Sequence, residues 1–224
     1  SRTDVVLSVR VRAGLAADGA TVSISVEGPS AGVAAKGSAP AGEKQSVSAG
    51  GAISAKVRLD SSMRKISTGY DAPGHEYLEA TLELTVADAK LWWPNNLGGQ
   101  PLYRVTATLL PGTGEAGGTA ASPAASWSRR IGLRTIGVVQ KPDEWGKSFA
   151  LEANGVPFFA MGADYVPEDS LITRNTKART ERLVKTAAQA NHNCIRVWGG
   201  GYYPDDSFYD LCDRYGLLVW QDFM

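Results

Sequence analysis

The sequence predicts an all-β immunoglobulin-like sandwich over residues 1–139, followed by β/α units of a parallel α/β sheet or barrel over residues 140–224. Two observations predict this division. Apolar residues alternate with polar ones in the first part, whereas short apolar runs alternate with amphipathic segments in the second. A chain of 224 residues has room for one large domain or two small ones. Its apolar content of 43% allows a packed core.

Strict alternation predicts antiparallel strands in the first part. Each run has a period of two and is bounded by Gly, Pro, Asp or Ser, as half-buried strands are. About seven strands in roughly 130 residues suit an immunoglobulin-like sandwich. Residues 28–51 and 111–126 are rich in Ala, Gly and Ser, so we expect surface loops there. The clearest runs are Val5–Val11, Thr21–Val26, Ile53–Leu59, Leu82–Val86 and Leu102–Leu109.

After Lys141 the pattern predicts strands buried on both faces and separated by helices. Asn154-Gly155 accepts the positive φ angles of a tight hairpin turn. Gly216 is suited to end a helix. The order β-α-β-α-β predicts parallel strands joined by helices. The predicted strands are 156–161, 193–198 and 217–220, and the predicted helices are 177–190 and 205–215.

Composition excludes several classes of function. With 23 basic and 23 acidic side chains the net charge is zero, which argues against a nucleic-acid partner. No run approaches the roughly 18 apolar residues of a membrane span, and the start lacks a signal-peptide layout. We therefore expect no membrane partner and a soluble chain, with a cytoplasmic location favoured over secretion. Cys194 and Cys212 form no CxxC motif, so we expect no zinc site, other metal or cofactor.

The residues that follow the apolar runs are the candidates for chemistry, because ligands of parallel sheets bind at the carboxyl ends of the strands. Asp164 follows the first run, Arg196 and Trp198 close the second, and Asp222 follows the third. An aromatic ring can stack on the C–H face of a sugar while charged groups bond its hydroxyls, so this mixture favours a carbohydrate ligand. The triple glycine 199–201 fits neither the P-loop nor the GxGxxG spacing of nucleotide sites.

Four segments carry a resemblance to a known family. Residues 193–224, with Arg-Val-Trp-Gly-Gly-Gly and Val-Trp-Gln-Asp-Phe, and residues 162–170 resemble the barrel region of glycoside hydrolase family 2 β-mannosidases. Residues 91–103 and 130–136 are similar to the end of that family's immunoglobulin-like domain and the entry to its (β/α)8 TIM barrel. Residues 1–90 agree only in strand pattern.

The resemblance implies a fragment of a retaining exo-β-mannosidase that removes terminal β-linked mannose from oligosaccharides with two Glu residues. In the family one of them lies in an Asn-Glu pair, and this sequence has none. Both catalytic Glu are therefore expected beyond Met224, and the fragment alone is expected to be inactive. Arg196, Trp198, Asp222 and Asp164 would bind the substrate, with no cofactor and no metal. The incomplete barrel would expose a strand edge at 217–220, which predicts self-association.

Alternative roles remain open for the chain and for these residues. The chain could be a non-catalytic carbohydrate- or protein-binding sandwich module, or part of a related exo-β-glucosaminidase. Arg196 could form a structural ion pair with Asp222, with or without a substrate role, and Trp198 could be a core residue. Asp164, Glu168 and Asp169 could cap the following loop. Trp92 and Trp93 are expected to pack under the sandwich, with sugar stacking as the alternative.

Overall fold

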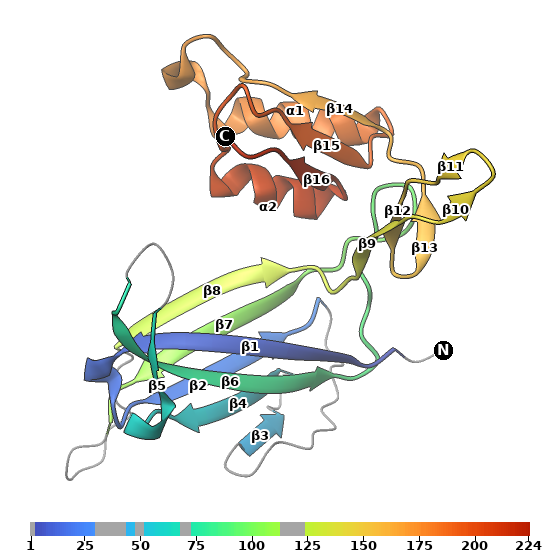
Figure 1. Ribbon diagram of the computed structural model, residues 1–224. Coiled ribbons are helices and arrows are strands. Elements are labelled where there is room, and N and C mark those ends of the chain that lie inside the picture. Colours follow the sequence, from blue (N-terminus) through green and yellow to red (C-terminus); the bar gives the residue numbers. More distant parts are fainter. Residues whose placement is uncertain (1–2, 30–43, 48–51, 68–72, 113–123) are drawn as a thin grey trace. The chain divides into compact units, whose positions relative to one another are not determined.

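The computed structural model describes residues 3–29, 44–47, 52–67, 73–112 and 124–224. It forms two compact units, which Figure 1 draws as a ribbon coloured along the sequence. Ser1–Ala89 and Tyr103–Arg130 make up the first unit, and Lys90–Leu102 and Ile131–Met224 make up the second. Residues 131–139 belong to the second unit by their contacts. A boundary between folding domains after residue 139 stays a prediction.

The first unit consists of two antiparallel sheets with strand orders β1-β6-β5 and β3-β4-β2-β7-β8. Alternation builds their shared core, since every second residue of β2 and of most of β6 is buried. This architecture is compatible with the predicted sandwich. The strands are β1 Val5–Gly14, β2 Thr21–Glu27, β3 Lys44–Val47, β4 Ile53–Arg58, β5 Arg64–Ile66, β6 Glu76–Val86, β7 Tyr103–Leu110 and β8 Ala125–Ile131.

The five strands predicted from alternation are confirmed, whereas β3, β5 and β8 were not predicted. Strand β3 lies inside the predicted loop 28–51, whose residues 30–43 and 48–51 are outside the described part of the chain. Residues 113–123 of the second predicted loop are also outside it. Strand β8 carries the sequence Ala-Ser-Trp-Ser-Arg-Arg-Ile and is mostly exposed, so it lacks the regular apolar face that marks a strand.

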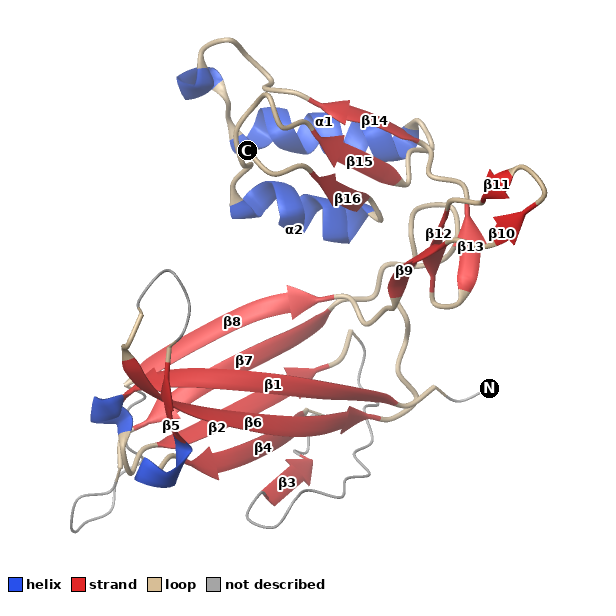
Figure 2. Cartoon of the chain, in the orientation of Figure 1, coloured by secondary structure: helices blue, strands red, loops and turns tan. Residues whose placement is uncertain are grey.

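The second unit contains a parallel sheet of order β14-β15-β16, with α1 and α2 on one face (Figure 2). Val184 of α1 and Phe208 and Leu211 of α2 pack against Ile195 and Val197 of β15 in one buried cluster. No helix of the described residues is long and apolar enough to cross a membrane. The elements are β14 Gly162–Tyr165, α1 Lys177–Gln189, β15 Cys194–Val197, α2 Asp206–Tyr215 and β16 Leu218–Gln221.

The two predicted helices and the two later strands are confirmed, but the first predicted strand, 156–161, was wrong in its length, its burial and its pairing. Residues 156–158 are instead β13, which pairs antiparallel with β12 (Ala150–Ala153) across Asn154 and Gly155 at φ 51° and 78°. The parallel strand begins only at Gly162, where a Cβ would lie 1.9 Å from the Cys194 carbonyl oxygen. The backbones approach too closely there for any other residue. Three short strands complete the unit, β9 Ile136–Val139, β10 Pro142–Asp143 and β11 Gly146–Lys147.

Residues 90–102 pack within the second unit. Trp92 is fully buried, and its indole Nε1 donates to the Asp213 carbonyl at 2.7 Å. Asn95 donates through Nδ2 to the carbonyls of Ala188 and His192 at 2.8 and 2.9 Å, which satisfies backbone acceptors at the end of α1. The expectation that Trp92 lies under the sandwich was wrong, and its burial leaves no face for a sugar.

Candidate functional site

Three of the four predicted site residues meet at the carboxyl ends of the parallel strands. Asp164 in β14 and Arg196 in β15 are paired Cα positions, and Asp222 directly follows β16. Adjacent parallel strands place paired side chains on the same face of the sheet. The register therefore aligns Asp164 beside Arg196.

Arg196 bridges the two carboxylates. Its Nη2 donates to Asp222 Oδ2 at 2.7 Å and its Nε donates to Asp222 Oδ1 at 3.2 Å, which is a two-point contact. Its Nη1 lies 3.2 and 3.3 Å from the two oxygens of Asp164. Asp222 Oδ2 also accepts from the backbone N–H of Gly199 at 3.1 Å. The cluster thus ties together the ends of three strands.

This cluster remains open to solvent. The side chains of Arg196, Asp164 and Asp222 are 43%, 51% and 22% exposed. Hydrogen bonds from Arg196 to Asp222 first, and then to Asp164, raise the pKa of Arg196 above its usual value. The guanidinium is therefore positively charged at neutral pH. Exposed ion pairs stabilise a fold by only about 0–1 kcal/mol, so stability alone is a weak reason for this arrangement.

The cluster presents hydrogen-bond donors and acceptors side by side. A guanidinium carries five N–H donors in a fixed plane, and Nη2 keeps one donor besides the one that Asp222 accepts. The carboxylates of Asp164 and Asp222 offer acceptors on either side. Adjacent donors and acceptors match the hydroxyl groups of a sugar ring, which act as both.

Trp198 lies just beyond the end of β15 and is not a core residue. It is 43% exposed, and its ring packs against Gly200, where a Cβ would lie 2.0 Å from Trp198 Cη2. A Cβ at Gly199 or Gly201 would meet its neighbours at 3.2 and 3.1 Å. The glycine at position 200 therefore makes room for the tryptophan ring rather than for a phosphate.

One aromatic residue beside this cluster was missed in the sequence. Trp220 of β16 is the Cα partner of Arg196 and is 47% exposed. It precedes Asp222 by two residues, and side chains two apart in a strand share a face. That alternation was the signal that could have identified Trp220. Its ring centroid lies 6.0 Å from that of Phe149.

Glu168 and Asp169 anchor the loop after β14. The Glu168 side chain is fully buried, and its Oε1 accepts from Tyr165 Oη at 2.6 Å and Thr180 Oγ1 at 2.7 Å. Asp169 accepts from the Leu171 N–H at 3.0 Å and pairs with Arg179 at 3.1 Å. Glu168 and Asp169 thus have the structural role in the following loop that the sequence left open for them. Asp164 does not share that role, because it bonds to Arg196. Within the described ranges, no group of three His, Cys, Asp or Glu side chains could hold a metal ion.

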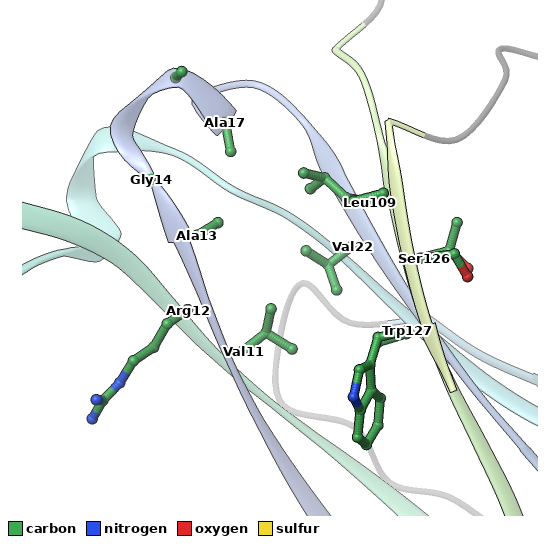
Figure 3. Close-up of a pocket in the computed structure, with 13 residues that line it drawn as sticks. Val11, Arg12, Ala13, Gly14, Ala17, Val22, Leu109, Ser126 and Trp127 are labelled. Carbon is green, nitrogen blue, oxygen red and sulfur yellow. The ribbon is translucent and has the colours of Figure 1, made fainter. Parts of the chain in front are cut away.

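The first unit has a cavity of its own, of about 490 Å³ (Figure 3). Val11, Val22, Leu109 and Trp127 line it, and Trp127 is 52% exposed. Arg12 points away from this space, and its Nε bonds Glu79 Oε2 at 2.8 Å. No carboxylate is among the lining residues in the described part of the unit. An apolar wall of this kind suits a sugar less well than the Arg196 cluster does.

The chain is similar to β-mannosidases. No protein-family model matches it. β-Mannosidase B of Emericella nidulans is 42% identical over 139 residues, which are 62% of this chain and 16% of that protein. The crystal structure of a β-D-mannosidase from Dictyoglomus thermophilum matches 99% of the present chain with a TM-score of 0.69 and 27% identity. The match covers 23% of the mannosidase chain. The resemblance found in the sequence is confirmed.

A likeness in fold extends to other glycosidases. The exo-chitosanase of Amycolatopsis orientalis matches 97% of this chain with a TM-score of 0.59 at 21% identity, over 20% of its own length. The chain spans 16% of the length of the β-mannosidase B proteins of Emericella nidulans and Thermothelomyces thermophilus.

Proposed function

We propose that this chain is part of a retaining exo-β-mannosidase of glycoside hydrolase family 2, which removes terminal β-linked mannose from oligosaccharides. The observation that carries the proposal is the Asp164–Arg196–Asp222 cluster at the ends of three parallel strands. The similarity to β-mannosidases supports the choice of mannose. The first unit would be the family's immunoglobulin-like sandwich, and the parallel sheet would be the start of its (β/α)8 barrel.

In this proposal Arg196, Asp164 and Asp222 hold the sugar, and two glutamates beyond Met224 catalyse the hydrolysis. Retaining glycosidases place two carboxyl groups roughly 5–5.5 Å apart, one as nucleophile and the other as acid/base. Arg196 would donate to ring hydroxyls while Asp164 and Asp222 fix its plane. Trp198 and Trp220 offer exposed rings beside the sugar. Binding that orients the anomeric carbon towards the nucleophile lowers the barrier by proximity.

The first test compares the 224-residue chain with a longer protein that contains it. Only the longer protein should hydrolyse aryl β-mannosides, because losing one member of a catalytic pair removes orders of magnitude of rate. The longer protein should carry an Asn-Glu pair and a further Glu at a strand end. Turnover by the 224-residue chain that disappears in Asp222→Ala would contradict this division of roles.

Arg196→Gln in the longer protein tests the cluster itself. We expect kcat/KM for the mannoside to fall about 10- to 100-fold, because hydrogen bonds to charged groups are worth about 1.5–3 kcal/mol. Arg182→Gln on the exposed side of α1 is the matched control and should keep activity. A preference for aryl β-glucosaminides would instead favour the glucosaminidase alternative. Sugar binding without hydrolysis of either substrate would favour a non-catalytic module.

A further inference from the structure

A cavity of the second unit opens between the start of α1 and the loop before α2. Its volume is about 420 Å³, which lies within the range of small-molecule sites. It lies on the other side of β14 from Asp164, because successive side chains of a strand point to opposite faces. Tyr165 follows Asp164 and packs against Phe208 at 4.6 Å between ring centroids. The cavity is lined by Tyr165, Asn175, Lys177, Tyr202, Tyr203 and Phe208, among others.

Tyrosine rings, and the amide of Asn175 that holds one of their hydroxyl groups, give this cavity its chemistry. Asn175 Nδ2 donates to the hydroxyl oxygen of Tyr202, which leaves the Tyr202 proton available to another acceptor. The Asn175 Oδ1 atom is buried and has no hydrogen-bond partner among the described residues. Because that oxygen has no accessible surface, Asn175 can act in this cavity only by holding the Tyr202 hydroxyl through Nδ2.

The charges around the cavity favour a neutral ligand. Lys177 and Asp205 both line it and carry opposite charges, and the Asp205 carboxylate is held as the N-cap of α2. An anion would be attracted by the ammonium group and repelled by the carboxylate. A neutral polyol can accept hydrogen bonds from Lys177 and from Tyr202. The aromatic rings can cover its C–H faces.

We propose that this cavity binds one hexose unit of a mannose-containing oligosaccharide, as a sugar site separate from the Asp164–Arg196–Asp222 cluster. The choice of mannose rests on the proposed function. The existence of a sugar site rests only on the cavity, the tyrosines and Asn175.

The test titrates β-1,4-mannotriose into the 224-residue chain and follows binding by saturation-transfer NMR. Tyr202→Phe and Asn175→Leu should each weaken binding about threefold or more, the effect of one lost hydrogen bond. Arg182→Gln, on the exposed side of α1 and outside the cavity lining, is the matched control and should leave this binding unchanged. In the wild-type chain, magnetisation should pass between tyrosine ring protons and the sugar, an observation that needs no variant.

Several results would contradict the proposed sugar site. Absence of binding at millimolar mannotriose, or equal binding by wild type, Tyr202→Phe and Asn175→Leu, would overturn the site. Binding that disappears in Arg196→Gln but persists in Tyr202→Phe would also overturn it. Chitotriose binding that depends on Tyr202, with no binding of mannotriose, would overturn the choice of mannose and count against the proposed function as well. The other outcomes concern this cavity alone and leave the proposed mannosidase activity of the longer protein unaffected.

Discussion

Gly200 determines where the Trp198 ring can lie. The ring occupies the space that a side chain at position 200 would need, since a Cβ there would lie 2.0 Å from Trp198 Cη2. Packing of this kind fixes an aromatic ring without hydrogen bonds and leaves its other side free. Trp198 keeps 43% of its surface exposed, so it can still contact a ligand. The orientation of this ring therefore depends on the absence of one methyl group.

Gly200→Ala tests that dependence without changing the tryptophan. The added methyl group should displace the Trp198 ring and lower kcat/KM of the longer protein by about tenfold or more, because misplacement by about 1 Å can cost roughly a hundredfold. The melting temperature should change little, since Trp198 is not a core residue. Kinetics and thermal unfolding of the same variant give the two quantities.

Gly137→Ala is the matched control for this substitution. A Cβ at Gly137 meets nothing within 4 Å, so this variant should keep both activity and stability. Unchanged kinetics in Gly200→Ala, with a large drop in melting temperature, would show that Trp198 packs as a structural residue. That result would remove Trp198 from the proposed sugar site.

At the scale of elements, the caps of α2 explain why this helix could be predicted with its ends. Asp205 accepts from the N–H groups of Ser207 and Phe208 at 2.9 and 3.3 Å. At the other end Gly216 adopts φ 77°, which a residue with a Cβ rarely does. Both signals are local, so they are visible in the sequence. Asp at the N-cap is a common start signal of a helix, and Gly after the last turn is a common stop signal.

Asp205→Ala should lower the free energy of unfolding by about 1 kcal/mol at pH 7, the usual value of an N-cap. Bonds from the Ser207 hydroxyl first, and from backbone N–H groups, lower the pKa of Asp205 below its ordinary value of 3.8. A lowered folded-state pKa means that this stabilisation is present above pH 3.8 and is lost as the pH falls through the folded-state value. The difference from wild type in urea unfolding should therefore shrink towards pH 3.

Asp205→Asn separates the cap from its charge. Asparagine caps a helix about as well as aspartate, so this variant should unfold within a few tenths of a kcal/mol of wild type at pH 7. It should show no loss of the cap between pH 5 and pH 3. If Asp205→Ala is equally destabilised at both pH values, the carboxylate is not the source of the stabilisation.

Elements that depend on distant contacts were harder to predict. The apolar run 156–161 predicts a buried strand, yet its first part pairs with β12 in a hairpin and Phe159 is 82% exposed. Hydrophobic periodicity does not show with which strand a short apolar run will pair. Within the site, the approach of Asp164 and Asp222 to Arg196 could be predicted because strand ends converge. The ring of Trp198 against Gly200 could not, because it depends on side-chain packing.

At the scale of the whole molecule, the two units bury their apolar side chains in different ways. The sheets of the first unit bury alternate residues between them, whereas helices α1 and α2 cover one face of the parallel sheet in the second. On the second unit a cavity of about 380 Å³ is lined by apolar side chains. Contiguous exposed apolar surface of this kind marks a contact region. Its lining includes Ile136, Val138, Phe149, Leu151, Leu218 and Trp220.

This surface and the sheet edge predict that the 224-residue chain self-associates. Strand β16 lies at the edge of its sheet, and an edge strand presents backbone groups that can pair with another chain. Trp220, 47% exposed on β16, adds apolar area beside that edge. Light scattering over a range of concentrations should show a mass above that of a monomer. Trp220→Glu should shift the mass towards the monomer, because a carboxylate cannot be buried unpaired without cost.

The matched control is Trp145→Glu, which places the same charge at a residue 89% exposed in the turn between β10 and β11. If association proceeds through β16, this variant should associate as wild type does. Equal loss of association in both variants would show that net charge, and not the β16 edge, controls it. A monodisperse monomer at the highest concentration would refute the prediction altogether, and the exposed edge would then be one that the 224-residue chain tolerates without a partner.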